Sequence, residues 1–390
     1  LAFTAGGYAL VMSTNNYQGL SPVYFELAFW PYTLLFAGVA TVEPLRWLAA
    51  RIFGPASPVV LGHRAMALVA LPVLAIEAHF ALVKWYGSRT CQVHFVPRET
   101  AITTALQGIA TDTGRPFGGL AATITGIGGK ESRTWLDLFG RDVRLWRETG
   151  NEHRFVGLWE FRIPTLYHYF STRTPSHHLV VTDFLARPRD RHTRAVAILT
   201  RADEDKMSLW GVRFVIADED LAIGRQVLAM PVPDMPALRL YELPDPNLGD
   251  YSPTRLLTAP DFATGLGLMR DPDFDGRADV VVSDDLADGT LVAARRARLV
   301  YQPHGFDLHA ESDGRSVLVL PVQFSHCWRA SGAGNPELFR ANLMQLGVLF
   351  EGSLDARLEF RFGPGWSSLC RLDDLRDVER LGIRNARPET

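Results

Sequence analysis

The sequence predicts an α+β protein in which two transmembrane helices precede an exoplasmic mixed α/β domain and a C-terminal antiparallel β-sandwich. Three observations predict this fold class: two long apolar runs near the N-terminus, a middle region with both helix and strand patterns, and a C-terminal region in which apolar and polar residues alternate with a period of two. With 390 residues and 47% hydrophobic content, the chain can form more than one domain. The expected divisions are a membrane region at 1–88, the mixed domain at 89–254, and a helix followed by the sandwich at 255–390.

The two apolar runs predict transmembrane helices at about 27–48 and 64–86. The first run is uncharged from Leu27 to Val42, which gives roughly 24 Å of helix against the roughly 30 Å of a bilayer's hydrocarbon core. The second run extends from Ala65 to Val83 and ends at a Lys-Trp-Tyr anchor.

Two ionisable residues, Glu77 and His79, interrupt the second run. In a membrane helix they would be intramembrane polar contacts that face other helices, because a charge exposed to lipid is costly. The alternative is a helical hairpin buried inside a soluble protein, which these two residues favour.

The distribution of positive charge predicts the orientation. The loop between the runs carries Arg46, Arg51 and Arg64, whereas residues 1–26 contain no Lys or Arg. By the positive-inside rule the loop is cytoplasmic, and the chain after about residue 88 lies outside. We therefore expect a bacterial inner (plasma) membrane protein whose large C-terminal part is periplasmic or extracellular. No basic n-region opens the chain, so no signal peptide is predicted, and the N-terminus is expected to continue a longer protein.

Charge and cysteine content narrow the function classes. A net charge of -3 and a pI near 6.4 give no general attraction to nucleic acid. The three cysteines match no zinc or redox motif and allow at most one bridge. Cys327 and Cys370 flank the expected sandwich, and an oxidising compartment permits a disulfide between them.

The outer region contains several predicted elements in order. Its first half has a strand at LAATITGI, helices at SRTWLDLFGRDVRLWRE and HHLVVTDFLAR, and a short helix, DEDKMSLWG, before the strand VRFVIAD. Its second half has the helix FATGLGLMR, the strand ADVVVSD, and alternating segments ARLVYQPHGFDLHAE, SVLVLPVQFS, FRANLMQLGVLFEG and ARLEFRFGP. The last four predict an antiparallel sheet packed on one face.

The stretch DPDFDGRADVVV, residues 271–282, has the spacing of a calcium loop, with acids at Asp271, Asp273, Asp275 and Asp279. A twelve-residue loop needs an acid at its last position, where this chain has Val282, although a loop with ligands at positions 1, 3, 5 and 9 is still satisfied. The alternative is a turn between a helix and a strand, in which Asp and Gly serve local hydrogen bonds. We favour the turn and expect no metal site.

The succession of outer segments resembles the C-terminal portion of YfhO-like proteins, bacterial multi-pass membrane proteins of the GT-C type. The matching segments are IPTLYHYFSTRTP, MSLWGVRFVIAD, FDGRADVVV, and VLVLPVQFSHCWRA followed by FRANLMQLGVLF and LEFRFGP, over roughly residues 115–365. The resemblance implies a polyprenyl-phosphate sugar donor, a cell-surface glycan acceptor and membrane lipid as partners, and an exodomain that positions substrate. It assigns no catalytic residue here, because the family's candidate acid lies in an earlier loop. This part alone is expected to bind no cofactor and to be inactive.

An aromatic segment gives the candidate contacts for glycan or lipid phosphate, because aromatic faces stack on sugar rings and Tyr and His tips bond hydroxyls. These candidates are Trp159, Tyr167, His168 and Tyr169. The alternative for them is a packed core edge. For the protein as a whole, the alternative to a glycosyltransferase is a non-catalytic, membrane-anchored periplasmic module that binds glycan or protein.

Overall fold

The computed structural model divides the chain into two units, Leu1–Val96 and Pro97–Thr390. It describes residues 98–125, 161–166, 174–186, 190–192, 197–233, 235–283, 289–361 and 369–383, with single residues around 47–54, 140–149, 158 and 286. The two expected transmembrane helices lie outside the described residues, except for Trp47 and Leu48, which are helical. No helix among the described residues has both the length and the apolar composition that a bilayer crossing requires.

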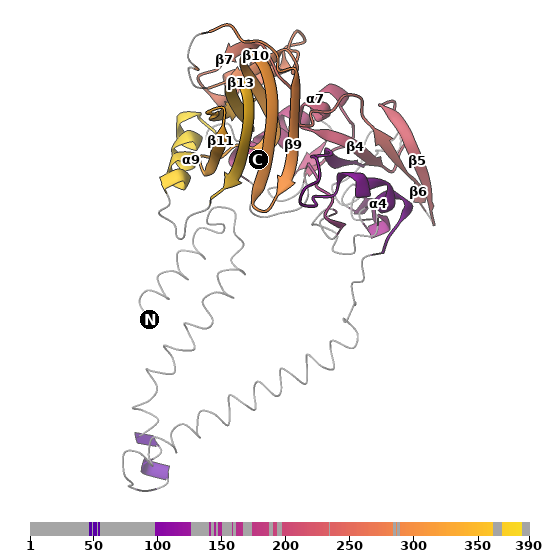
Figure 1. The fold of residues 1–390 in the computed structure, drawn as a ribbon. Coiled ribbons are helices and arrows are strands. Elements are labelled where there is room, and N and C mark those ends of the chain that lie inside the picture. The colour runs from indigo at the N-terminus through magenta and orange to yellow at the C-terminus, as the bar shows by residue number, and fades with distance from the viewer. Residues whose placement is uncertain are drawn as a thin grey trace. The chain divides into compact units, whose positions relative to one another are not determined.

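A four-stranded sheet organises the first half of the second unit, in the order β1-β4-β6-β5 (Figure 1). The elements of this half are α4 (Ala101–Leu106), η2 (Gln107–Ile109), β1 (Leu120–Ile124), α6 (Pro175–Leu179), the π-helix η4 (Val180–Leu185), β2 (Arg191–His192), β3 (Ala197–Ile198), α7 (Glu204–Leu209), β4 (Val212–Ala217), β5 (Arg225–Val232) and β6 (Met235–Glu242). β1 and β4 are parallel, whereas β6 is antiparallel to β4 and β5. The strands predicted at LAATITGI and VRFVIAD, and the short helix before the second, are confirmed as β1, β4 and α7.

Local chemistry places α7 and β4. The Asp203 side chain accepts a hydrogen bond from the Lys206 backbone and caps the helix, as Asp does at N-caps. Gly211 then turns the chain into β4 with a φ of 81°. A Cβ at this position would lie 2.6 Å from Cβ of Pro321 and 2.9 Å from the carbonyl oxygen of Asn247, so only glycine fits where the first sheet meets β10 (Gly305–Gln323).

A seven-stranded sheet forms the second half, in the order β7-β8-β12-β13-β10-β9, with β11 also paired to β13 (Figure 1). The elements are β7 (Arg255–Thr258), α8 (Phe262–Arg270), β8 (Asp279–Val282), β9 (Arg296–Gln302), β10, β11 (Trp328–Ala333), β12 (Glu337–Ala341), β13 (Gln345–Phe360) and α9 (Leu369–Arg380). The predicted helix FATGLGLMR and strand ADVVVSD are confirmed as α8 and β8. The antiparallel pairing is present throughout, except that β7 and β8 are parallel.

The described residues of this half form one hydrogen-bonded sheet where two stacked sheets were expected. Two pairs of predicted segments are each one long strand, because SVLVLPVQFS continues FDLHAE in β10 and ARLEFRFGP continues QLGVLFEG in β13. β10 continues through bulges against β13 between Glu311 and Arg315 and between Leu320 and Gln323. A bulge inserts residues without ending a strand, so the polar residues at 312–315, which separate two of the predicted segments, lie within β10.

Buried amide side chains join the end of α7 and the segment after β6 to the seven-stranded sheet. Asn247 donates from Nδ2 to the carbonyl oxygens of Leu209 and Val319, at 3.3 and 2.9 Å. Gln345 donates to the same Leu209 oxygen at 3.0 Å. Asn342 accepts from the Val281 backbone at 2.9 Å and donates to Gln345 at 3.0 Å. Because buried amides are costly unless they are hydrogen-bonded, this cluster specifies how these segments meet the seven-stranded sheet.

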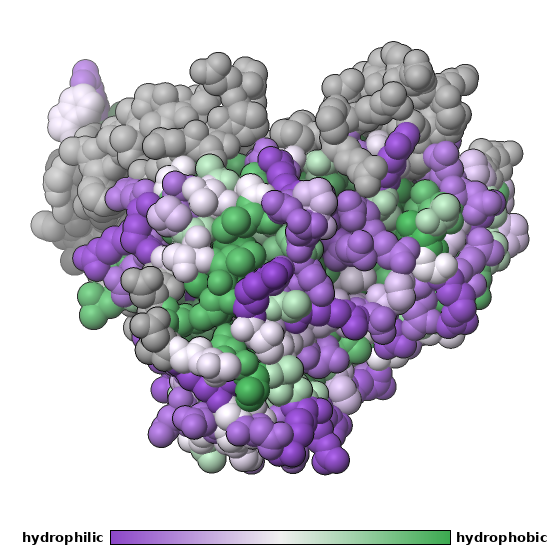
Figure 2. All heavy atoms as spheres, turned by 90° about the horizontal axis from the view of Figure 1, so that it is seen from above, coloured by the Kyte–Doolittle hydropathy of each residue, from purple (hydrophilic) through white to green (hydrophobic). Residues whose placement is uncertain are grey.

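The surface of the second unit mixes polar and apolar side chains. Figure 2 shows a band of apolar side chains across one face, bordered by polar ones. The large apolar residues that are exposed among the described residues of this unit are Val227, Phe360, Leu369, Leu372 and Leu375. Three of them lie on α9 at intervals of three residues. Much of any folded surface is apolar, so no partner follows from their exposure alone.

Candidate functional site

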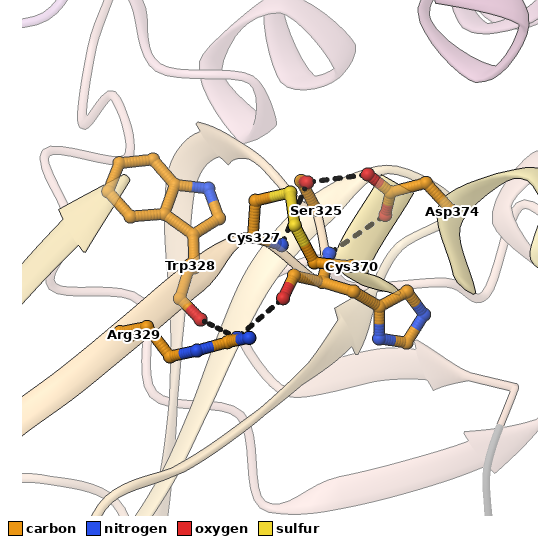
Figure 3. Close-up of a disulfide and its surroundings, with 7 residues drawn as sticks. Ser325, Cys327, Trp328, Arg329, Cys370 and Asp374 are labelled. Atoms are coloured by element: carbon orange, nitrogen blue, oxygen red, sulfur yellow. Dashed lines mark hydrogen bonds between the residues drawn. A yellow bond between two sulfur atoms is a disulfide. The ribbon is translucent and has the colours of Figure 1, made fainter. Parts of the chain in front are cut away.

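A disulfide between Cys327 and Cys370 anchors α9 to the start of β11 (Figure 3). This is the pair that the sequence analysis considered for a bridge. Both cysteines are buried, at 1% and 7% exposure. Beside them the Ser325 hydroxyl donates to Asp374 at 2.6 Å, and the His326 backbone donates to the other oxygen of that carboxylate at 2.8 Å. The bridge and these bonds fix the first half of α9.

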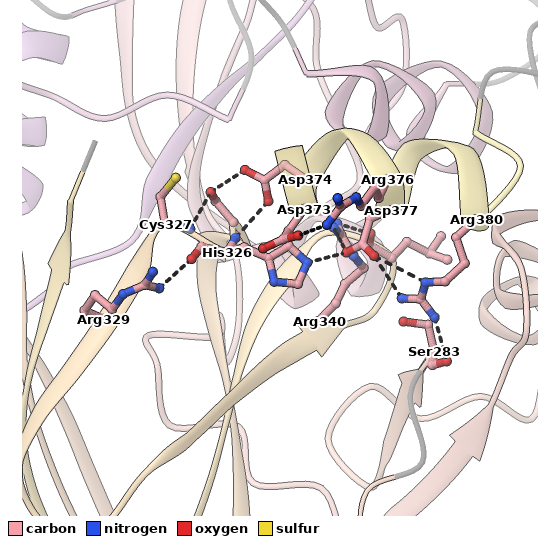
Figure 4. A network of polar contacts seen from close by, with 12 residues as sticks. Ser283, His326, Cys327, Arg329, Arg340, Asp373, Asp374, Arg376, Asp377 and Arg380 are labelled. Atoms are coloured by element: carbon pink, nitrogen blue, oxygen red, sulfur yellow. Dashed lines mark hydrogen bonds and ion pairs between the residues drawn. The ribbon is translucent and has the colours of Figure 1, made fainter. Parts of the chain in front are cut away.

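A polar network on the next turn of α9 is centred on the carboxylate of Asp377 (Figure 4). Its Oδ2 lies 2.8 Å from Nε2 of His326 and accepts from Nη2 of Arg340 at 2.9 Å. Its Oδ1 accepts from Nη2 of Arg380 at 3.1 Å. Arg340 is nearly buried, with 7% of its side chain exposed, and its guanidinium lies 4.7 Å from the centre of the Phe324 ring.

The network shifts the proton affinities of its members in opposite directions. Burial acts to raise the pKa of Asp377, but the hydrogen bonds from His326 and Arg340 outweigh it and hold that pKa well below its usual value. The hydrogen bond to Asp377 raises the pKa of His326, against the opposing effect of burial. His326 is therefore protonated to a higher pH than an isolated imidazole.

A histidine paired with an aspartate could transfer protons, but its neighbours here indicate a structural role. Ser325 donates its hydroxyl proton to Asp374, so this neighbouring hydroxyl is not hydrogen-bonded to His326 as a nucleophile would be. Asp377 is shared by His326 and two guanidinium groups, which is typical of an ion-pair network that holds elements together. We assign the network to the attachment of α9.

A small cavity lies beside this network, between α8, the end of β8 and Leu381. It has a volume of about 10 Å³, which suits about one water molecule. Nε of Arg340 and Oγ of Ser283 are buried there without a hydrogen-bond partner in the described part of the chain. The cavity is too small for a substrate.

The calcium-like stretch is a turn, as favoured from the sequence. Asp271 and Asp275 each accept from a backbone N–H two residues later, at 2.9 Å. Asp279 is fully buried and accepts from Arg255, whose hydrogen bond lowers the pKa of that carboxyl against the effect of burial. Within the described residues, no three carboxylate, His or Cys side chains gather in a way that could hold a metal ion.

An open hollow of about 350 Å³ lies beside the β4–β5 loop, next to the start of β5 and the end of β6, where Gln226 and Tyr241 are paired. Its lining comes from the loop residues Asp220, Leu221, Ala222, Ile223 and Gly224, from Gln226 and from Tyr241. Tyr241 fixes the loop, because its hydroxyl donates to Asp220 and accepts from the Leu221 backbone, both at 3.0 Å. Burial raises the pKa of this phenol, so it stays neutral.

The residues predicted from the sequence to contact glycan or lipid phosphate lie outside the described residues. These are Trp159, Tyr167, His168 and Tyr169, and the intramembrane candidates Glu77 and His79 also lie outside them. Among the described residues, Trp328 is buried at 8% exposure and donates to the Gln323 carbonyl, and the Asn342 side chain accepts from the Val281 backbone.

The Asp377 network and the hollow were not predicted from the sequence. The network had a usable signal, because Asp374 and Asp377 follow Cys370 by four and seven residues and therefore share its face of a helix. Once Cys327 is paired with Cys370, His326 must lie near those carboxylates. The hollow had no such signal, since its loop and Tyr241 are brought together only by strand pairing.

Comparison with known proteins identified no relative: no family model, no curated protein and no solved structure matches the chain.

Proposed function

We propose that residues 97–390 are the exodomain of a membrane-anchored, YfhO-like protein of the GT-C type. In this proposal the whole protein transfers sugar from a polyprenyl-phosphate donor to a cell-surface acceptor, and the exodomain positions substrate. The support from the sequence is the pair of apolar runs, the arginines between them and the order of the outer segments. Catalytic residues are not assigned.

The observation that carries the proposal is the buried disulfide between Cys327 and Cys370. Disulfides form and persist in oxidising compartments such as the periplasm or cell surface, whereas cytosolic thiols are kept reduced. An oxidised, buried bridge therefore supports an exodomain outside the membrane, which is where the positive-inside rule also predicts it. The disulfide and the distribution of positive charge are independent arguments, and both favour the periplasmic or extracellular side of the membrane for this domain.

The location is tested by counting free thiols in intact cells. Cells expressing the chain are quenched with acid, and the denatured protein is alkylated with a maleimide-polyethylene glycol that adds a visible mass to each thiol. We expect one modified thiol, Cys91, before reduction and three after it. A Cys91→Ser variant should give none and two. Three modified thiols without reduction would place the chain in a reducing compartment and refute the proposal.

The activity is tested in membranes that contain the full-length gene product. Labelled polyprenyl-phosphate sugars are supplied, and transfer of label to cell-surface glycan is measured against membranes that lack the protein. Transfer supports the transferase. A second candidate, a non-catalytic module that binds glycan or protein, is favoured by the open hollow beside the β4–β5 loop, and binding without transfer would select it.

A further inference from the structure

The outward side of α9 carries a stripe of exposed leucines. The stripe consists of Leu369, Leu372 and Leu375, which are three residues apart and therefore follow one side of the helix. The opposite side holds Cys370 and Asp377, which are buried against the rest of the unit. Phe360, a further exposed apolar residue, lies near the start of the helix, because it is paired with Trp328 next to the disulfide.

The charged side chains of α9 are sorted by sign. Asp374 and Asp377 turn toward the sheet, where they accept from Ser325 and Arg340 (Figure 4). All three arginines of the helix are exposed: Arg371, Arg376 and Arg380. Two acids of the helix also reach solvent: Asp373 and Glu379. Positive charge therefore exceeds negative charge beside the leucine stripe.

The start of α9 lies at the end of the unit where the chain enters it (Figure 1). Gly114 donates from its backbone to Tyr301, at the end of β9, and Phe360 donates to His304 in the turn that follows. The second apolar run ends near Tyr86, and residues 87–97, which separate it from the described part of the unit, can span at most roughly 40 Å. A bilayer that holds this run is thus within reach of the unit.

The size of the stripe favours a lipid surface over a partner protein. A stable protein interface buries about 800 Å² on each side, which three leucines on one helix do not supply. A weak contact is sufficient for a unit that is tethered to its partner, because the tether keeps the local concentration high. A helix with leucines on one side and arginines beside them is typical of the interface between lipid headgroups and acyl chains.

We propose that α9 docks on the headgroup region of an anionic bilayer through Leu369, Leu372 and Leu375. The inference deepens the proposed function and rests on it for the presence of a bilayer. The leucines enter the interface, and the guanidinium groups beside them attract lipid phosphates. The disulfide and the Asp377 network hold the helix in place before docking, which reduces the entropy lost. Docking fixes the orientation in which the exodomain meets its substrate.

The test uses the full chain in nanodiscs of phosphatidylglycerol, which is anionic, or of phosphatidylcholine, which has no net charge. In a Cys91→Ser background the disulfide occupies the other two cysteines, so an introduced cysteine takes the thiol-reactive fluorophore NBD. Leu372→Cys places the probe on the stripe. Val227→Cys on β5 is the matched control, because Leu372 and Val227 are almost equally exposed, at 37% and 38%. We expect emission from the stripe probe alone to shift to shorter wavelength and to be quenched by lipids with a nitroxide on the acyl chain.

A second variant tests the contribution of charge. Arg371→Gln, combined with the stripe probe in phosphatidylglycerol, should lower the equilibrium constant for docking roughly fivefold, the effect of one arginine at an anionic surface. Arg296→Gln is the matched control, because Arg296 is also exposed but lies at the start of β9. It should dock like the parent.

Three outcomes would overturn the inference. One is an equal response of the two probes, and another is quenching as strong in phosphatidylcholine as in phosphatidylglycerol. The third is a shift of the stripe probe without nitroxide quenching, which would indicate that protein and not lipid covers the leucines.

Failure of docking can be distinguished from failure of the proposed function. If the probe does not respond while the thiol pattern and sugar transfer are as expected, docking alone is refuted. If the chain stays in water without detergent, the membrane anchor is refuted, and the same probe with phosphatidylglycerol vesicles added to the chain then decides whether the stripe binds lipid.

Discussion

Removing the disulfide should cost the second unit a large share of its stability. The perturbation is the double substitution Cys327→Ala and Cys370→Ala, which avoids leaving buried hydroxyls unpaired. The bridge spans 43 residues of sequence. In the chain-entropy model a closed loop of that length stabilises the folded state by about 4 kcal/mol, because it restricts the unfolded chain. For a unit of this size, that corresponds to a fall in Tm of about 8 °C.

The assay is thermal and urea unfolding followed by tryptophan fluorescence, with pulse proteolysis as a second probe. Cys91→Ala is the matched control, because it removes a cysteine outside the bridge. Reduction of the parent chain should reproduce the loss, and trypsin should then cut first in α9, because the exposed Arg371, Arg376 and Arg380 become cleavable once the helix is no longer held and can unfold locally. A double variant as stable as the control would refute the reasoning, because restriction of the unfolded chain by the bridge would then contribute nothing to the free energy of unfolding.

Three further predictions concern the polar residues. His326→Gln should destabilise the protein at pH 5.5 but not at pH 9. The pKa of His326 is raised in the folded state, so its contribution to stability is fully present below the unfolded-state pKa of about 6.5 and is lost as the pH rises through the folded-state pKa. Unfolding curves across this pH range check the prediction, and an equal or larger loss of stability at pH 9 would contradict it. Asn342→Ala should lower the free energy of unfolding in urea by about 2 kcal/mol more than Asn335→Ala does. Both positions have a positive φ, but only the change at Asn342 leaves the buried N–H of Val281 without its partner. Equal losses of stability would argue against a stabilising role for the amide cluster. Calcium or EGTA should leave Tm unchanged, because the carboxylates of Asp271 and Asp275 are used in the turn and that of Asp279 in the pair with Arg255. A rise in Tm with calcium would restore the metal-site interpretation.

Local patterns in the sequence were sufficient to locate most described elements. Short runs rich in Val, Ile and Phe identified β4 and β8, and Asp203 before an apolar stretch marked the start of α7. The same logic failed inside β10, because a bulge interrupts the alternation without ending the strand. The turn at 271–278 was distinguished from a calcium loop by the missing last ligand, Val282, which is a local feature.

By itself, the sequence determined that the second unit mixes helices and strands, and it located β1, α7, β4, α8 and β8 and the turn before β8, since each depends on residues within a few positions of one another. Only the tertiary structure decided that Cys327 and Cys370 pair, that His326 and Arg340 share the carboxylate of Asp377, and that the β4–β5 loop lines a hollow with Gln226 and Tyr241. These contacts join residues tens of positions apart, and the packing of side chains on both faces of the sheets selects them. No periodicity along the chain encodes which distant polar groups are brought together.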